Sequence, residues 1–365
     1  MSNFPLTDMA LKMFCPGNVA QLDDAGLPSV LVWIPAFKLS DVLNTTDDST
    51  HPAFIVNGRE IPGFYYSKYQ NVVHNGRAYS LPGEDPKVAA KFDDALEYSD
   101  AKGYGWHMST AAEWAAIALW CKKNGWLPYG NNKSGKDSRE SSVKAIPTDY
   151  GSDGSVTRVA TGTGPLTWSH DKTMSGIWDL NGNTWEWQGG FRLVWGELQI
   201  LANNDAADLD NPQNTTSVCW KAISAADGSL VNPECSIEDT SAKSSGNTVK
   251  LDYLDNVWTY STGISSAIDS TRACDFGSVA CTAGICEAAK LLLRALALLP
   301  DDGADVSGYE GDKVFWNNSR KEMIMSRSGH YGHGSGSGLF YVGGGNPRDY
   351  VSWQMGFRAS YIPNI

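Results

Sequence analysis

The side chains that could do chemistry in this 365-residue chain are few and scattered. Among its six histidines, His330 and His333 form the closest pair, but no histidine belongs to the His-Glu-x-x-His helix pattern of a zinc hydrolase. The pair lies in a Gly/Ser-rich loop without a neighbouring Cys or Glu, and two imidazoles alone seldom hold a metal. The sequence therefore predicts no metal centre, and it favours a surface-loop position for both histidines.

Thiols and carboxylates give equally weak signals for catalysis. The seven cysteines are odd in number and irregularly spaced, which favours reduced, mostly buried thiols over a disulfide framework. Cys281 and Cys286 lack the second pair that a zinc site needs. Glu113 and Glu186 lie between Trp or Ala neighbours, so we expect them to cap or to accept hydrogen bonds from buried backbone and indole groups rather than to act as acid or base.

Cofactor-binding motifs give no support for a bound group. GSGSG (334–338) and GGG (343–345) lack the lysine and the strand–helix context of phosphate-binding loops, and no Gly-x-Ser-x-Gly elbow occurs. We therefore expect no cofactor. A structural calcium ion is the alternative, since oxygen-bearing side chains gather within 203–214; without EF-hand spacing a solvated acidic loop is favoured. The candidate ligands are Asn203, Asn204, Asp205, Asp208 and Asp210.

The segment RSGHYGHGSGSGLFYVGGGNPRDYVSWQMGFR (327–358) has a mixed composition that suits binding. Tyr, Ser, Gly, Asn and His are the residues of antibody-like contact surfaces, because rigid amphipathic rings give contact area and small polar groups adapt their hydrogen bonds. The expected energetic anchors are Tyr331, Tyr341, Tyr350 and Trp353. The alternative is a glycine-rich connecting loop that binds nothing.

The bulk composition excludes several classes of protein. With 42% hydrophobic residues, 37 Gly and 14 Trp, the chain is typical of an ordered, loop-rich globular protein. A formal charge of −12 disfavours a nucleic-acid partner. The first twenty residues have no basic n-region and only a short apolar run, so we expect neither a secretion signal nor a membrane span. We therefore expect a cytoplasmic or virion-associated protein.

Helix and strand signals indicate an α+β domain. Residues 29–38 and 64–73 are rich in β-formers, and the region 86–103 carries a helical stripe of Val88, Phe92, Ala95 and Leu96 that ends at Gly103. A second helix is predicted from Thr110, which forms a capping-box pattern with Glu113, to Gly125. Residues 130–165 are expected to form long surface loops with one short hairpin.

The second half of the chain is more irregular. Residues 176–201 predict a sheet segment with a turn at Asn181-Gly182, strand-like pieces lie within 216–223 and 255–263, and 286–300 predicts a short helix. We expect an N-terminal arm (1–28), a single domain (29–361) with an insertion at about 196–310, and a binding region at 327–358. No heptad repeat demands oligomeric assembly.

Three motifs together resemble one known fold. WHMSTAAEW (106–114) resembles the R-L-P-T-x-A-E-W helix start of the formylglycine-generating-enzyme type of C-type-lectin fold, with His107-Met108-Ser109 in place of Arg-Leu-Pro. NGNTWEWQGG (181–190) is similar to that superfamily's G-N-V-W-E-W strand, and GFR (356–358) to its closing motif. From the residues alone, Trp185 and Trp187 supply wide apolar plates on one face of a strand, and Arg358 either stacks on a ring or satisfies carbonyls.

The resemblance implies one of two functions. The enzymatic branch, the sulfatase-modifying oxidases, carries a reactive cysteine pair in its C-terminal segment, whereas the last cysteine here is Cys286. The other branch is the variable proteins of diversity-generating retroelements, which include phage receptor-binding tropism determinants and are diversified by replacing template adenines, chiefly in Asn codons. The segment 327–358 resembles that variable region, although Ser328 and Tyr331 stand where the family has Gly and Trp.

The resemblance to variable proteins implies a binding protein without catalysis, whose partner is a macromolecular target such as a cell-surface protein or glycan. The framework residues would be Leu339, Phe340, Trp353, Phe357 and Arg358. The displayed ligand-binding residues would be His330, Gly332, His333, Gly336, Tyr341, Gly343, Gly345, Asn346, Asp349, Tyr350 and Ser352. All six of their residue types can be reached from an Asn codon by changing adenines. The alternative is a formylglycine-generating oxidoreductase.

Overall fold

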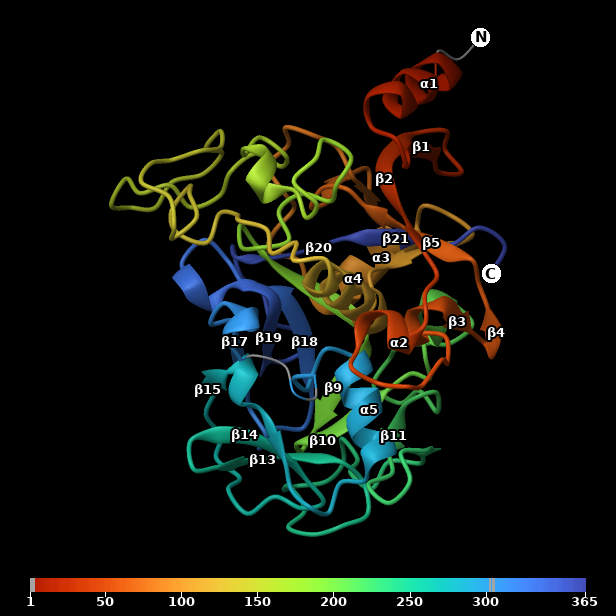
Figure 1. Cartoon of the computed structure of the whole chain (residues 1–365), viewed down its shortest axis with the longest axis vertical. Coiled ribbons are helices and arrows are strands. Elements are labelled where there is room, and N and C mark those ends of the chain that lie inside the picture. The colour runs from red at the N-terminus through yellow and green to blue at the C-terminus, as the bar shows by residue number, and fades with distance from the viewer. Residues whose placement is uncertain (1–3, 302, 304–305) are drawn as a thin grey trace.

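The structure, a computed structural model, describes residues 4–301, 303 and 306–365 and has two main sheets with α4 between them in Figure 1. Five α-helices are described in these ranges: α1 (Phe4–Phe14), α2 (Leu39–Val42), α3 (Phe92–Asp100), α4 (Ala111–Lys123) and α5 (Glu287–Ala295). α1 extends away from the body at one end of the view (Figure 1). The predicted α+β class is confirmed.

The smaller sheet joins the two ends of the chain. Its strand order is β1 (Asn18–Leu22), β2 (Pro28–Pro35), β5 (Gly63–Ser67), β21 (Ala359–Tyr361) and β8 (Trp106–Met108), and every neighbouring pair is antiparallel. The C-terminal strand β21 therefore lies between β5 and β8 and fixes the residues that precede it. Because β1 is hydrogen-bonded to β2, the predicted arm 1–28 supplies an edge strand of the domain instead of standing apart from it.

The larger sheet is built around β9 (Trp185–Val194). On one side follow β18 (Met323–Ser328), β19 (Gly338–Asn346), β17 (Lys313–Trp316) and β15 (Arg272–Asp275). On the other side follow β10 (Glu197–Ile200), β13 (Lys250–Leu254), β14 (Val257–Ser261) and β16 (Ala280–Cys281), with β11 (Lys221–Ile223) and β12 (Leu230–Val231) attached through β10. β20 (Met355–Phe357) pairs in parallel with β9. The strands of the predicted insertion thus extend the sheet of the main domain.

Two short hairpins complete the β-structure: β3 (Ile55–Val56) with β4 (Arg59–Glu60), and β6 (Val72–His74) with β7 (Arg77–Tyr79). The predicted strand at 29–38 is confirmed by β2, whereas the predicted strand at 64–73 is divided into β5 and β6. The loops at 130–165 contain the expected small hairpin, with isolated bridges from Pro147 to Val159 and from Tyr150 to Val156.

The helix α4 confirms its predicted start. The Thr110 side chain accepts a hydrogen bond from the Glu113 backbone N–H at 3.1 Å, and the Glu113 carboxylate accepts one from the Thr110 N–H at 3.2 Å. This capping box satisfies donors that the first helical turn leaves free. Nearly every side chain of α4 is buried, which is expected of a helix that is apolar on all sides and lies inside the domain.

The helix predicted from residue 86 begins at Phe92, so its predicted start is wrong. Ala89 has a φ of 56°, a left-handed conformation that a continuing helix cannot contain. The backbone N–H groups of Ala89 and Phe92 donate to the carbonyls of Ser352 and Arg348. Contacts with the C-terminal segment therefore hold residues 86–91 out of the helix.

The seven cysteines are free thiols, as predicted. Cys15, Cys121 and Cys235 are buried and the other four are half-buried, so the expectation of mostly buried thiols is only partly met. Among the described residues, no helix combines the length and the apolar character that crossing a membrane requires.

Candidate binding face

A buried ion pair anchors the C-terminal segment. The Nε of Arg358 lies 2.7 Å from Oε2 of Glu186, and its Nη2 lies 3.1 Å from Oε1. The guanidinium also donates to four backbone carbonyls, of Ser67, Lys68, Trp178 and Asp179. Both side chains are fully buried. Arg358 therefore satisfies carbonyls, which was one of its two predicted roles. The other predicted role, stacking on a ring, is represented by a weaker contact, with the guanidinium carbon 6.0 Å from the ring centre of Tyr66.

The two candidate carboxylates have structural partners. Glu186 accepts hydrogen bonds from Arg358 and from Gln70 Nε2 at 2.9 Å, while Glu113 caps α4 and accepts a hydrogen bond from His107 Nε2 at 2.8 Å. Burial alone would lower the pKa of His107, but the charge and hydrogen bond of Glu113 raise it above its ordinary value overall. These partners agree with the structural role predicted for both carboxylates. The donors to Glu186, however, are an amide and a guanidinium group and not backbone or indole N–H groups.

Two loops carry most of the predicted ligand-binding residues. The 329–337 loop connects β18 to β19, and the 347–354 loop connects β19 to β20. The first is fastened at its start, where Ser328 Oγ accepts a hydrogen bond from the Gly182 N–H and donates one to the Gly182 carbonyl, each at 3.0 Å. We call the exposed parts of these two loops, together with Gly345 and Asn346 at the end of β19, the binding face.

Seven of the eleven predicted display positions are at least partly exposed there. Gly332 and Asp349 are exposed, and five are half-buried: His333, Gly345, Asn346, Tyr350 and Ser352. The two loops leave opposite ends of β19, at Gly338 and at Asn346, and they meet where Gln354 Nε2 donates a hydrogen bond to the Tyr331 hydroxyl at 3.3 Å.

The expectation that the other four face solvent is wrong. Tyr341 is 2% exposed, because its hydroxyl accepts a hydrogen bond from Trp185 Nε1 at 2.8 Å and its ring lies among neighbouring rings. His330 is buried against Trp185. Gly336 and Gly343 are buried where a Cβ would lie 2.9 Å from Lys313 Cγ and 2.5 Å from Ser326 Oγ, respectively.

Rings beneath the 329–337 loop form an aromatic cluster of Trp185, Phe315, His330, His333 and Tyr341. The two imidazole centres are 4.1 Å apart, His333 stacks on Tyr341 at 5.1 Å and on Phe315 at 5.4 Å, and Trp185 meets His330 edge-on at 4.5 Å. Burial lowers the pKa of His330 to about 3 and that of His333 to about 4. Both imidazoles are therefore neutral near pH 7 and act as aromatic plates. Phe315 belongs to none of the sequence motifs, so its place in the aromatic cluster was not predicted.

The framework prediction is correct for Leu339, Phe340, Phe357 and Arg358, which are buried, and wrong for Trp353. The Trp353 side chain is 72% exposed, and the hydrogen bond that it receives from the described residues reaches its backbone carbonyl, from Arg158 Nη1 at 3.3 Å. The ring therefore stands free on the 347–354 loop. Its exposure agrees with the second expectation for this residue, that of an energetic anchor.

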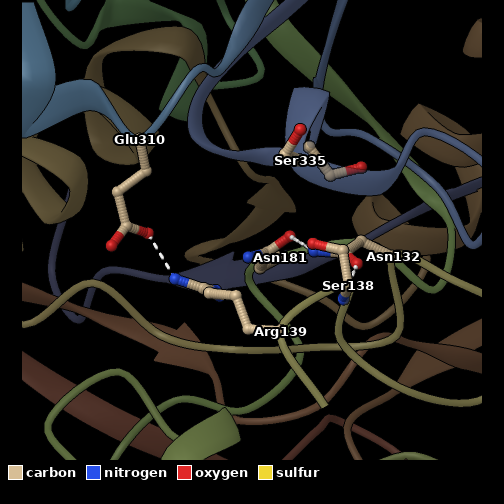
Figure 2. A pocket seen from close by; sticks show the side chains of 7 residues that line it. Asn132, Ser138, Arg139, Asn181, Glu310 and Ser335 are labelled. Atoms are coloured by element: carbon tan, nitrogen blue, oxygen red, sulfur yellow. Dashed lines mark hydrogen bonds and ion pairs between the residues drawn. The ribbon is translucent and has the colours of Figure 1, made fainter. Parts of the chain in front are cut away.

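A polar pocket opens beside the 329–337 loop. It has a volume of about 300 Å³ and is lined by Asn132, Ser138, Arg139, Asn181, Glu310, Ser335 and Ser337. Figure 2 shows Glu310 and Arg139 joined by their ion pair on one side of the pocket and Asn181 and Ser335 on the other. Ser335 and Ser337 come from the predicted binding region, whereas Arg139 comes from the long loops at 130–165.

Three of the five residues considered for calcium are occupied by protein contacts. Asn204 bonds to Thr110, Glu113 and the Ala53 carbonyl, while Asp205 and Asp208 accept hydrogen bonds from Asn57. Throughout residues 4–301, 303 and 306–365, no three His, Cys, Asp or Glu side chains come together as a metal site. This loop braces the start of α4.

Comparison with known proteins identifies the family. The model of the sulfatase-modifying factor enzyme 1-like domain matches residues 13–195, which is half of the chain. The chain belongs to this family. Its fold is accordingly the formylglycine-generating-enzyme-like variant of the C-type-lectin fold, as the sequence motifs predicted.

Solved structures that align with this chain include two Major Tropism Determinant variants and PvdO from Pseudomonas aeruginosa. The Major Tropism Determinant P3c variant is 9% identical, with 93% of this chain and 70% of that chain covered and a TM-score of 0.30. The U1 variant is 10% identical, with 91% and 62% covered and a TM-score of 0.29. PvdO from Pseudomonas aeruginosa is 14% identical, with 92% and 95% covered and a TM-score of 0.30. No curated protein sequence gives a significant match.

Proposed function

We propose that this chain is a non-catalytic binding protein that recognises a macromolecular target through the binding face. The observation that carries the proposal is the contrast between the two loops and what lies below them. Seven predicted display positions are accessible on the loops and at the end of β19. Phe340, Phe357 and Arg358 are buried and hydrogen-bonded to distant parts of the chain. A rigid base under small polar and aromatic side chains is the arrangement that antibody-like surfaces use.

Diversification of these positions from a retroelement template is the second part of the proposal. It rests on the resemblance of 327–358 to a variable region and on residue types that adenine changes in Asn codons can produce. Sequencing the DNA around the gene tests it. We expect a reverse transcriptase gene and a near-copy of the 327–358 coding sequence that differs only at adenines, and the absence of both would contradict diversification.

A sulfatase-modifying oxidase is the second candidate, since the family match favours it. Against it, residues 287–365 contain no cysteine, so the C-terminal segment has no thiolate to offer a substrate. Incubating the purified protein with a cysteine-containing sulfatase peptide and copper distinguishes the two candidates. Loss of the peptide thiol to an aldehyde would support the oxidase, and an unchanged peptide supports a binding protein.

A further inference from the structure

A smaller niche adjoins the polar pocket. The niche shares Asn181 and Glu310 with the pocket, and its inner wall includes Asp312 and Leu339. Its volume is about 10 Å³, which is the space that one water molecule needs. A Cβ at Gly338 would lie 2.1 Å from Asp312 Oδ1, so the missing side chain keeps the niche open. It admits a group the size of an ammonium or a hydroxyl and nothing larger.

Asp312 presents an unused acceptor to this niche. The residue is only 5% exposed, and its Oδ2 accepts a hydrogen bond from the Phe340 N–H at 2.7 Å, whereas its Oδ1 has no donor among the described residues. Burial raises the pKa of Asp312 well above its ordinary value, and the charge of Glu310 adds to this. The neutral form of this carboxyl is therefore favoured while the niche is empty, and a bound cationic donor would favour the ionised form.

The cations nearby are already committed to other partners. Arg139 donates through Nε and Nη2 to Asp137 and through Nη1 to Glu310, and Arg327 donates to the carbonyls of Leu296, Ala297 and Tyr341. Lys122 Nζ lies 4.8 Å from the ring centre of Tyr309 and makes no hydrogen bond to Asp312.

Among the described residues that line it, the pocket therefore offers free acceptors, and its cation, Arg139, is already paired. Those acceptors are the second oxygen of Glu310 at its side and Oδ1 of Asp312 at its end. A carboxylate or phosphate group would be repelled here, and a guanidinium group exceeds the water-sized niche.

We propose that the pocket and its niche receive a primary ammonium group, carried by a lysine side chain of a protein target. The ammonium occupies the niche, donates to Asp312 Oδ1 and lies close to Glu310. The methylene stem that precedes the ammonium lies in the wider pocket, because the niche itself holds only the ammonium. The inference rests on the proposed function, because it names one chemical group of the target and places it beside the binding face.

A neutral hydroxyl of a glycan would fit the same volume, but it brings no charge to compensate the carboxylates. The discriminating experiment uses small probes and needs no target. The ¹⁵N-labelled full chain is titrated at neutral pH with Nα-acetyl-lysine methylamide, with its Nε-acetylated form and with the analogue that carries a hydroxyl in place of the amine. We expect the amine to shift the amides of Gly338, Leu339 and Phe340, and the other two probes to bind about tenfold or more weakly.

Three variants locate the site. Asp312→Asn removes the charge but keeps an oxygen for the Phe340 N–H, and Ser335→Trp blocks the mouth from an exposed position that leaves the core untouched. Both should weaken amine binding about tenfold or more, while Glu238→Gln, which changes an exposed glutamate of the 196–310 segment, should not. Amide spectra verify that each variant is folded.

Equal binding of the hydroxyl probe, undiminished binding to Ser335→Trp, or no amide shift in the folded wild-type chain would each overturn the inference. If the hydroxyl probe bound equally well, the pocket would instead be assigned to a hydroxyl group of a glycan. Because the probes bypass the target, such a failure leaves the proposed binding face to be judged by substitutions in its own loops.

Discussion

Arg358 and Glu186 form a fully buried ion pair that joins the last motif of the chain to the central strand β9, with 2.7 Å between Nε and Oε2. Glu186 also faces Met355–Phe357 through the parallel pairing of β9 with β20. Everything between residues 329 and 354 is therefore held between two anchored strands. A single charge pair fixes the base on which the two loops stand.

Neutralising one partner of this pair should destabilise the whole domain. We expect Glu186→Gln to cost about 3–5 kcal/mol in the free energy of unfolding, because Arg358 keeps a buried charge without a counter-ion. Urea denaturation followed by circular dichroism measures the loss. The control is Arg320→Ala, which removes an exposed ion pair with Asp269 and should cost less than about 1 kcal/mol. Equal losses in the two variants would show that burial of the pair does not matter.

The Thr110 cap is the second structural prediction. Its hydroxyl accepts from the Glu113 N–H and donates to Asn204 Oδ1 at 2.6 Å, so Thr110→Ala leaves two buried groups without partners. We expect a loss of about 1–2 kcal/mol from the cap alone. Thr110→Ser, which keeps the hydroxyl, should recover most of it in the same denaturation measurement, and failure to recover would assign the effect to the lost methyl group.

The sequence predicts those elements whose signals are local. The capping box of Thr110 and Glu113 lies within four residues, and the strand at 28–35 carries its own β-formers, so both are found where they are expected. The start of α3 is different, since the carbonyls of Arg348 and Ser352, more than 250 residues away, bind the backbone at Ala89 and Phe92. No window of sequence around residue 86 contains that information.

The candidate site shows the same division. The segment 327–358 is recognisable from composition, but its alternation of small and aromatic residues does not say which side each faces. Tyr341 points inward because Trp185, distant in sequence, offers its indole N–H. Trp353 points outward, and the described residues bind its backbone carbonyl and not its ring. Arg139 and Asp312, which line the pocket and its niche, belong to no motif and become visible only when the loops are folded together.

Acid should weaken the fold through four histidines whose pKa the folded structure lowers. Burial lowers the pKa of His51, His170 and His333 to about 4 and that of His330 to about 3, each from an ordinary value of 6.5. The unfolded chain therefore binds more protons than the folded chain between these values, so the free energy of unfolding falls as the pH drops from about 6.5 towards 4.

The variant His333→Phe tests this dependence at the binding face. The new ring can stack on Phe315 and Tyr341 but cannot take up a proton, so the loss of stability between pH 6.5 and 4.5 should become smaller than in the wild type. Urea denaturation at the two pH values gives the comparison, with His74→Gln on the exposed β6 strand as the control. An unchanged pH dependence in His333→Phe would mean that this imidazole titrates freely in the folded protein.

The binding face itself should tolerate change where the framework does not. We expect the combined variant Asp349→Ala, Tyr350→Ala, Ser352→Ala to lose about 1–2 kcal/mol at most, because each side chain is at least partly exposed. Tyr341→Ala should lose about 3–5 kcal/mol, since it empties a buried ring site and leaves the Trp185 N–H without an acceptor.

Four accessible positions, Asn346, Asp349, Tyr350 and Ser352, lie outside the aromatic cluster and are not glycines with a close neighbour. Randomising these four in a library displayed on yeast extends this contrast from stability to recognition. The library should remain folded and should yield binders to a protein chosen in advance, such as lysozyme, because the loops rest on a base that their side chains do not build. In a matched library, the four buried positions His330, Gly336, Tyr341 and Gly343 are randomised instead. It should display poorly and yield none, because each change meets atoms already in contact. Binders arising equally from both libraries would place recognition outside the binding face.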